Sequence, residues 1–219
     1  SYITIADDVT SGVLTTLRKA STDTRRFGFL EAPLRKRIAQ AVERGDACLL
    51  RLQVRQNGKP TGWAGQYDDL TLQPAQGRKF ELPSIAAQES VGVVRYLMSI
   101  PHPSPAVAAA VEGAADWFGR VEISGWKLET FDAPLEQYQY HASGKDRRLV
   151  RDPAATGLWA RFYDLQDNSV VLATRESKRV ANYSDIPRER RTGYEWYGRW
   201  PQSLLGLEYP KWKQGLSHD

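Results

Sequence analysis

The sequence predicts a mainly α-helical fold with a small β-hairpin and long connecting loops. Several segments place apolar residues at helical spacing behind clear helix-start signals. One stretch of the last third is instead rich in aromatic and β-branched residues around an Asp-Asn pair, which is typical of a short hairpin. The loop over residues 57–83 is too long for a simple helical bundle. Functional sites tend to lie on such loops.

Each predicted helix combines a start signal with apolar residues three or four positions apart. The start signals, in chain order, are Asp7 or Asp8, Pro33, Ser84, Ser104-Pro105 and Ser184. The apolar stripes behind the first four are Val9, Val13, Leu14 and Leu17; then Leu34, Ile38, Ala41 and Val42; then Ala87, Val91, Val94, Leu97 and Met98; then Val107, Val111, Ala114 and Phe118. The fifth helix is rich in Arg and is expected to end near Gly193 or Gly198.

The predicted hairpin joins residues 158–165 to residues 169–174, with Asp167-Asn168 at the turn. A weaker alternation of apolar and polar residues runs over 121–130. The sequence shows no internal repeat and no low-complexity segment.

The composition excludes several classes of protein and site. The chain has 219 residues, of which 41% are hydrophobic and 26% charged, as in ordinary globular domains. No apolar run is long enough to span a bilayer, so no membrane role is expected. Cys48 is the only cysteine and the three His are scattered, which argues against a Cys/His zinc site and leaves few bases for a Ser/His/Asp triad. If the protein is an enzyme, we expect its chemistry to rest on Asp, Glu, Lys, Arg or Tyr.

The net charge of +4 lies entirely in the last third of the chain. Residues 1–141 contain 16 basic and 16 acidic residues, whereas residues 142–219 contain 14 basic and 10 acidic ones. An anionic partner would explain this excess, and an ordinary solvated basic surface explains it equally well.

Three groups of residues could carry chemistry. Asp7-Asp8 at a helix start favours capping, with a hard-cation site as the alternative. The second group lies on the loop 63–84, where an exposed Trp could stack on a sugar, although a core Trp on a solvated loop is the more common case. It comprises Trp63, Gln66, Tyr67, Asp68, Asp69, Arg78, Lys79 and Glu81.

The third group interleaves Arg with aromatic residues, which suits an acidic polysaccharide or a single-stranded nucleic acid. Its members are Arg147, Arg148, Arg151, Trp159, Arg161, Phe162, Tyr163, Arg175, Lys178, Arg179, Tyr194, Trp196, Tyr197 and Trp200. A half-buried strand with Arg161 on its polar face is the simpler interpretation of "WARFY".

Four motifs together resemble the calcium-dependent pectate lyases of polysaccharide lyase family ten. They are "ELPSIAAQESVGVVRYLMSI", "SPAVAAAVEGAADWF", "LWARFYDL" and "ERRTGYEWYGRWP", and the resemblance extends over residues 3–205. It implies a helical α/α toroid and one catalytic module over residues 1–219. It implies a secreted, monomeric enzyme that cleaves polygalacturonate by β-elimination with Ca²⁺. Such modules carry a further N-terminal helical segment, so the resemblance also implies a truncated module.

The resemblance also implies roles for individual residues. Arg78, on the loop before "ELPS", would be the base that removes the C5 proton, with its pKa lowered by nearby cations. Asp7 or Asp8 would bind calcium. The remaining matches are substrate-binding residues: Arg147, Arg161 and Arg175 for uronate carboxylates, and Trp63 and Gln66 in the cleft.

Two alternatives to an active lyase remain at this point. The first is a non-catalytic galacturonan-binding remnant that keeps the cleft but has lost the metal site. The second is a helical nucleic-acid-binding domain, which would show steeply salt-dependent binding. The neutral first two-thirds of the chain argue against the second, so we expect no nucleic-acid partner.

Overall fold

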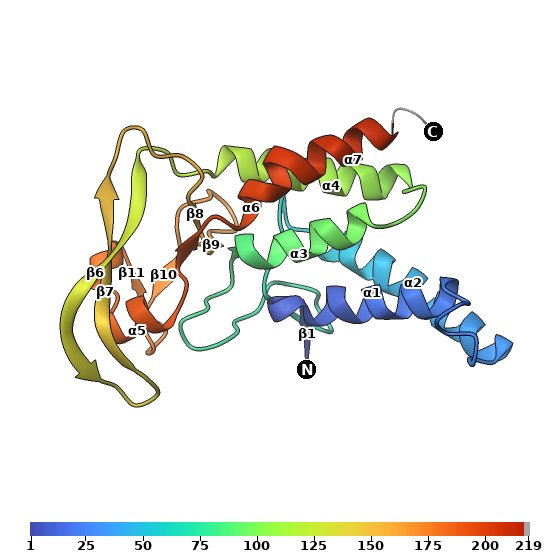
Figure 1. Cartoon of the computed structure of the whole chain (residues 1–219), viewed down its shortest axis with the longest axis horizontal. Helices are drawn as coiled ribbons and strands as arrows, with labels where there is room; N and C mark the ends of the chain where they lie inside the picture. The colour runs from blue at the N-terminus through green and yellow to red at the C-terminus, as the bar shows by residue number, and fades with distance from the viewer. Residues whose placement is uncertain (217–219) are drawn as a thin grey trace.

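The computed structural model describes residues 1–216 and combines long helices with short antiparallel strand pairs. Figure 1 shows the long helices at one end of the molecule and a two-stranded ribbon at the other. The helices are α1 (Val9–Thr22), α2 (Ala32–Leu52), α3 (Ala87–Met98), α4 (Pro105–Arg120), α5 (Arg188–Gly193), α6 (Trp200–Ser203) and α7 (Tyr209–Leu216). Shorter helical turns are η1 (Ala6–Asp8) and η2 (Tyr183–Asp185), and a π-helix, η3 (Leu204–Glu208), joins α6 to α7.

The strands of the described chain pair two by two. They are β1 (Tyr2–Thr4), β2 (Arg55–Gln56), β3 (Lys59–Pro60), β4 (Gln66–Asp68), β5 (Ile85–Ala86), β6 (Trp126–Gln137), β7 (Ala142–Arg151), β8 (Trp159–Ala160), β9 (Phe162–Tyr163), β10 (Leu172–Ala173), β11 (Arg179–Val180) and β12 (Tyr197–Gly198). The antiparallel pairs are β1 with β4, β2 with β3, β5 with β9, β6 with β7, β8 with β12, and β10 with β11.

The expected α/α toroid is wrong. Between α4 and α6 the described chain forms the strands β6 to β12, and α5 is the only α-helix in that interval. A toroid needs helices along its whole length, whereas this third of the chain pairs its backbone between strands. The fold is therefore a mixed one, in which a helical end supports a region of short strands and a long ribbon.

Two predicted helices form for the expected reasons. In α4 the Oγ of Ser104 accepts a hydrogen bond from the backbone N of Val107, and Pro105 occupies the first turn. The predicted stripe of α4 is buried, as is that of α3 from Ala87 to Leu97. Ser84 does not cap α3, because its hydroxyl donates to the backbone O of Leu82 and Ala86 occupies the cap position.

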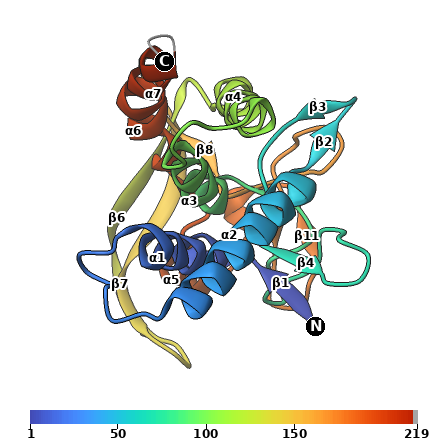
Figure 2. The ribbon, with the colours of Figure 1, turned by 90° about the vertical axis from the view of Figure 1, so that its right-hand side faces the viewer.

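Helix α1 departs from the prediction at its start and along one face. Val9 and Val13 are 50% and 54% exposed, while Leu14 is buried. Asp8 stands at the cap position with φ of 56° and makes no capping hydrogen bond. The carboxylate therefore does not fill the capping role that its position favoured. Helices α1 and α2 pack against each other, as Figure 2 shows.

The β6–β7 ribbon is longer than the predicted alternation over 121–130. Leu128 pairs with Leu149, and both are partly buried against the core. The partner strand is dominated by charged side chains, so it carries little apolar alternation. In the predicted hairpin, Tyr163 does bridge Val170 around Asn168, whose φ is 62°. Strands β8 and β9, however, mainly pair with β12 and β5.

Buried tryptophans hold these elements together. Four indole rings are fully buried, and each N–H finds an acceptor. The pairs are Trp63 with Leu49 O, Trp117 with Asn168 Oδ1, Trp159 with Phe118 O, and Trp196 with Arg190 O. These hydrogen bonds join α2, α4, α5 and the strand region into one core.

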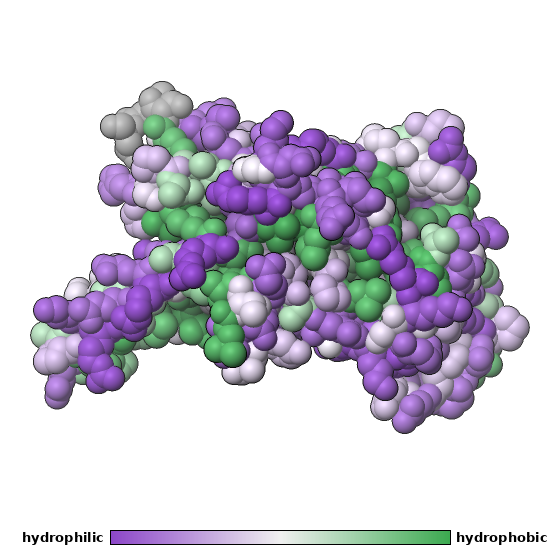
Figure 3. Space-filling view, turned by 180° about the vertical axis from the view of Figure 1, so that it is seen from behind, coloured by the Kyte–Doolittle hydropathy of each residue, from purple (hydrophilic) through white to green (hydrophobic). Residues whose placement is uncertain are grey.

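The face seen in Figure 3 carries a broken band of hydrophobic residues between hydrophilic margins. Among the described helices, none is both long and apolar enough to cross a membrane.

Candidate functional site

Arg78 projects from a tight turn that Glu81 closes. The backbone N of Glu81 donates to the O of Arg78 at 2.8 Å, and the N of Gly77 donates to the O of Glu81 at 3.0 Å. One carboxylate oxygen of Glu81 accepts from the backbone N of Arg78 at 2.9 Å, and the other accepts from its guanidinium at 2.8 Å. The Arg78 side chain is nonetheless 58% exposed. The backbone of the turn is thus held by hydrogen bonds, while the Arg78 guanidinium extends into solvent.

The 194–196 segment anchors this turn from behind. The hydroxyl of Tyr194 donates to Oε1 of Glu81 at 2.6 Å. Phe80, the residue before Glu81, packs edge-on against the Tyr194 ring at 4.8 Å and lies close to Trp196. Both aromatic residues and Phe80 are buried. The turn that carries Arg78 is therefore tied to the core through Phe80 and Glu81.

The charges of the turn shift the pKa values of both partners. The charge of Glu81 raises the pKa of Arg78 above its ordinary value, and the charge of Asp7 contributes in the same direction. Burial alone would raise the pKa of Glu81, but the hydrogen bond from Tyr194 and the charge of Arg78 outweigh it and lower that pKa. The expected lowering of the Arg78 pKa is not found in the protein alone, because its near neighbours are acidic rather than basic.

Asp7 and Asp8 diverge from each other. Both have φ of 56°, a left-handed conformation that is costly for residues other than glycine. The charge of Asp7 helps to raise the pKa of Arg78. By contrast, Oδ1 of Asp8 accepts a hydrogen bond from the hydroxyl of Ser11 on α1. A Cβ at Gly92 of α3 would lie only 1.8 Å from that oxygen, so Asp8 points at α3. Over residues 1–216, no group of three or more His, Cys, Asp or Glu could hold a metal.

Arg161 is buried in an ion pair and does not face a cleft. Its side chain is 8% exposed, and its Nε and one terminal nitrogen contact Oε1 of Glu89 at 3.1 and 2.5 Å. The guanidinium also lies 4.6 Å from the centre of the Tyr194 ring. Burial raises the pKa of Glu89 more than the charge of Arg161 lowers it. Arg161 therefore supports Tyr194 from inside the protein.

Arg175 lies beside the Arg78 turn. Its guanidinium stands 5.6 Å from the centre of the Phe80 ring and 5.4 Å from that of Tyr140. It also binds Glu189 bidentately, at 3.1 and 2.7 Å. The hydrogen bond from Arg175 is the main cause that lowers the pKa of Glu189 to about 2, and Arg190 contributes further.

Arg147 lies on β7, at a pocket of about 680 Å³ between the ribbon and residues 181–184. The pocket is lined by apolar and aromatic side chains and by the charged residues Asp146, Arg147, Arg148 and Arg191. One terminal nitrogen of Arg147 donates to the backbone O of Tyr194 at 3.4 Å. The Arg147 guanidinium is therefore held more weakly than those of Arg161 and Arg175, which form ion pairs with carboxylates.

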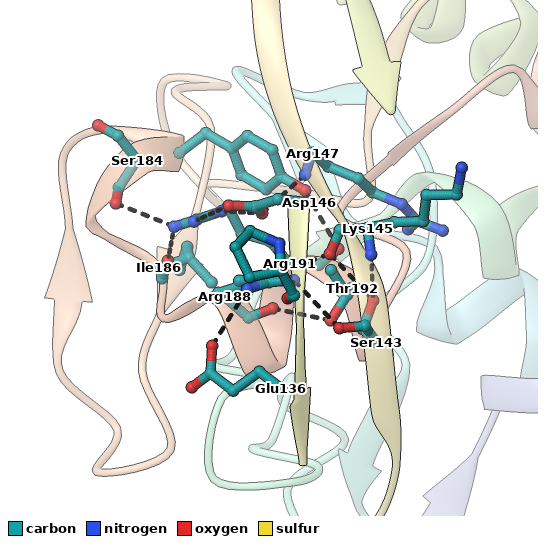
Figure 4. Close-up of polar contacts among 12 residues, drawn as sticks. Glu136, Ser143, Lys145, Asp146, Arg147, Ser184, Ile186, Arg188, Arg191 and Thr192 are labelled. Carbon is teal, nitrogen blue, oxygen red and sulfur yellow. Dashed lines mark hydrogen bonds and ion pairs between the residues drawn. The ribbon is translucent and has the colours of Figure 1, made fainter. Parts of the chain in front are cut away.

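Helix α5 fixes the ribbon next to Arg147, as Figure 4 shows. Arg191 binds Asp146 through two nitrogens at 2.9 and 2.6 Å. Arg188 reaches the backbone O of Ser143 at 3.1 Å and the carboxylate of Glu136 at 3.2 Å. The Arg-rich helix predicted from the sequence thus uses these cations to hold the fold together.

The remaining predicted cleft residues differ in placement. Trp63 is fully buried and donates its indole N–H to the backbone O of Leu49 at 2.8 Å. Its ring belongs to the core and has no free face for a sugar, so its assignment as a cleft residue is corrected here. Gln66 is half-buried on β4, accepts from Thr4 at 2.7 Å, and lines a small hollow with Glu81 and Glu89.

Sequence analysis named Glu81 and Tyr194 as candidates but paired neither with a cation, and it did not name Glu89 or Glu189. The spacing of Arg78 and Glu81 could have indicated an ion pair within a turn. No local pattern pairs Tyr194 with Glu81, Glu89 with Arg161 or Glu189 with Arg175, because each contact forms only through the fold.

Comparisons with known proteins identify the family and similar solved structures. A family model described as pectic acid lyase matches residues 1–205. The structure of the family 10 polysaccharide lyase from Cellvibrio cellulosa superimposes with a TM-score of 0.81 at 29% identity, over 95% of this chain and 62% of that one. A mutant of that enzyme in complex with trigalacturonic acid gives the same values. This chain thus spans less than two-thirds of the length of its structural neighbours. No curated protein matches it.

Proposed function

The chain belongs to the pectic acid lyase family, and on that premise we propose that it cleaves α-1,4-linked polygalacturonate by β-elimination. The observation that supports this most is the exposed guanidinium of Arg78 on a turn closed by Glu81, with Arg175 stacked on Phe80 of the same turn. A solved relative with the same fold is described with trigalacturonic acid, an oligomer of the proposed substrate.

Arg78 would act as the base in this reaction. The C5–H bond of a galacturonate breaks and its proton moves to the deprotonated guanidine. The electron pair forms the C4–C5 double bond, the C4–O glycosidic bond breaks, and the departing oxygen takes up a proton from water. The product carries a double bond conjugated to its carboxylate. The C5 proton is a weak acid, so the reaction needs a strong base. Little of the Arg78 guanidine is deprotonated near neutral pH, so the rate should rise at alkaline pH.

The other cations would bind the uronate carboxylates. Arg147 suits a distal carboxylate because its guanidinium has only a long hydrogen bond to a carbonyl. Arg175 keeps Glu189 as a partner, so it would contact substrate with its remaining donors. Gln66 would add an amide at the hollow beside Glu81. Arg161 would act through Tyr194, since its own side chain is buried.

The described part of the protein could supply only some of the oxygen ligands that a calcium ion needs here. Carboxylate oxygen is the right donor type, Asp7 and Asp8 are both exposed, and the charge of Asp7 acts on Arg78. The two side chains diverge, however, and the described chain adds no third carboxylate there. We propose that one of them holds Ca²⁺ together with substrate carboxylates. When bound, the ion would neutralise the carboxylate next to C5 and make the C5 proton more acidic.

A galacturonan-binding remnant without catalysis is the second candidate. The divergence of Asp7 and Asp8 favours it, because a lost calcium site would leave the arginines as binding groups. A secreted, monomeric state remains our prediction for either candidate.

The decisive experiment follows ultraviolet absorbance of polygalacturonate mixed with the protein, first with calcium and then with a chelator. The conjugated double bond gives a rise that hydrolysis and binding do not give. A calcium-dependent rise supports the lyase. Binding of the polymer without any rise supports the remnant, and the absence of both contradicts the two candidates.

A further inference from the structure

Glu81, the acidic residue paired with the proposed base Arg78, accepts three hydrogen bonds. Its two oxygens together accept hydrogen bonds from the Arg78 backbone, the Arg78 guanidinium and the Tyr194 hydroxyl. The side chain is only 14% exposed, so water screens these contacts poorly. A surface ion pair of this spacing would be weak, but this one is held on three sides.

The turn is shaped around this carboxylate. A Cβ at Gly77 would lie 2.4 Å from Oε2 of Glu81, so a side chain there would push the carboxylate away. Tyr194 is itself fixed, because Phe80 packs against its ring and Arg161 lies over it. The position of Glu81 is therefore set by the protein before any substrate arrives.

Glu81 opposes the chemistry required of Arg78. A guanidinium that donates to a carboxylate at 2.8 Å is stabilised in its protonated form, whereas a base must be deprotonated. The Tyr194 hydroxyl donates to the same oxygen, Oε1, and so shares the negative charge that Arg78 senses. The strength of the Arg78–Glu81 contact thus depends on Tyr194.

We propose that Glu81 is a positioning residue that sets the ionisation of Arg78, and that Tyr194 tunes it by holding Oε1. This inference rests on the proposed lyase function. The other charged groups facing the pair are Asp7 of η1, which acts on Arg78, and Glu89 and Arg161, which interact with Glu81. All three remain unchanged in the variants below.

The first test is Glu81→Gln, which keeps the size and an acceptor for the Arg78 backbone while removing the charge. The rising limb of log kcat against pH should move to lower pH by roughly half a unit. An opposite charge shifts a pKa by about 1–3 units when close, and less where the group is exposed. Glu195→Gln, which removes an equal charge from the exposed neighbour of Tyr194, is the control and should leave the limb in place.

The second test is Tyr194→Phe, which keeps the ring against Phe80 and removes the hydroxyl. The freed oxygen of Glu81 then interacts more strongly with Arg78, so the limb should move to higher pH by a few tenths of a unit. Limb shifts of opposite sign in the two variants would show that the ionisation of Arg78 has changed. A loss of structure alone would lower kcat without moving the limb. An unmoved limb in both variants overturns the inference.

A third measurement needs no catalysis. Carboxyl NMR should place the Glu81 pKa below its usual value in the free protein, and both Arg78→Gln and Tyr194→Phe should raise it. A Glu81 pKa that neither variant changes overturns the inference even if the enzyme is active. If the wild-type protein yields no ultraviolet rise, the proposed function fails, and the role of Glu81 in base catalysis fails with it.

Discussion

The buried ion pair of Arg161 and Glu89 gives the sharpest test of the structure. Replacing Arg161 by Ala would leave Glu89 buried with no cationic partner, while its Oε2 already lacks a hydrogen-bond partner. Removing one member of a buried pair costs about 3–5 kcal/mol. Loss of the contact with the Tyr194 ring adds about 0.5–2 kcal/mol. We therefore expect the free energy of unfolding to fall by about 4–7 kcal/mol, a large share of a typical total of about 5–15 kcal/mol.

Urea unfolding followed by tryptophan fluorescence measures this loss, because four indole rings are fully buried. The double variant Arg161→Met with Glu89→Leu is the matched control. It replaces both charges by apolar groups of similar size and should recover most of the stability. A loss below about 1 kcal/mol in Arg161→Ala would refute the buried pair, since exposed pairs contribute only that much.

The loss should also depend on pH. Burial raises the pKa of Glu89, and removing Arg161 raises it further. A carboxyl whose folded pKa is raised contributes most stability when protonated, so that contribution is lost as pH rises through the folded pKa. The difference between wild type and Arg161→Ala should therefore widen as pH rises above the raised folded pKa of Glu89 in the wild type, and level off above the still higher folded pKa in the variant. A difference that is constant with pH would assign the loss to packing alone.

Two further predictions concern the base and the acidic pair. Arg78→Ala should lower kcat at least about 100-fold, because a base acts in the transition state. Pelleting assays should still show polymer binding. Retained turnover would show that Arg78 is not the base. Gly92→Ala should raise the calcium concentration for half-maximal activity about tenfold, since the new Cβ displaces the Asp8 carboxylate. The same change should not lower the melting temperature, because Ala favours a helix over Gly by about 1 kcal/mol; an unchanged calcium requirement would argue that Asp7 alone is the ligand.

Local signals in the sequence predicted several elements correctly. Ser104 and Pro105 mark the start of α4 because a cap and a fixed φ act over neighbouring residues. The buried stripes of α3 and α4 follow from helical periodicity. The motifs also placed the chain in its family before any fold was known, and the family model confirms that placement.

Other elements depended on partners that are distant in the sequence. The β6–β7 ribbon needed the pairing of Leu128 with Leu149, which no window around either residue contains. Val9 and Val13 fit a helical stripe, yet the packing of α1 leaves them exposed. The toroid was inferred from resemblance, and the strand pairs of residues 126–198 overturned it.

The sequence by itself determined the family, the position of the Arg78 turn and the cationic character of the last third. Only the tertiary structure decided which cations are free to meet a substrate. Arg161 and Arg175 look alike in the sequence, but Glu89 encloses one while the other stays 38% exposed beside the turn. The reason is physical. A residue type and a spacing fix what a side chain can do, whereas its burial and its ion pairs depend on residues many positions away.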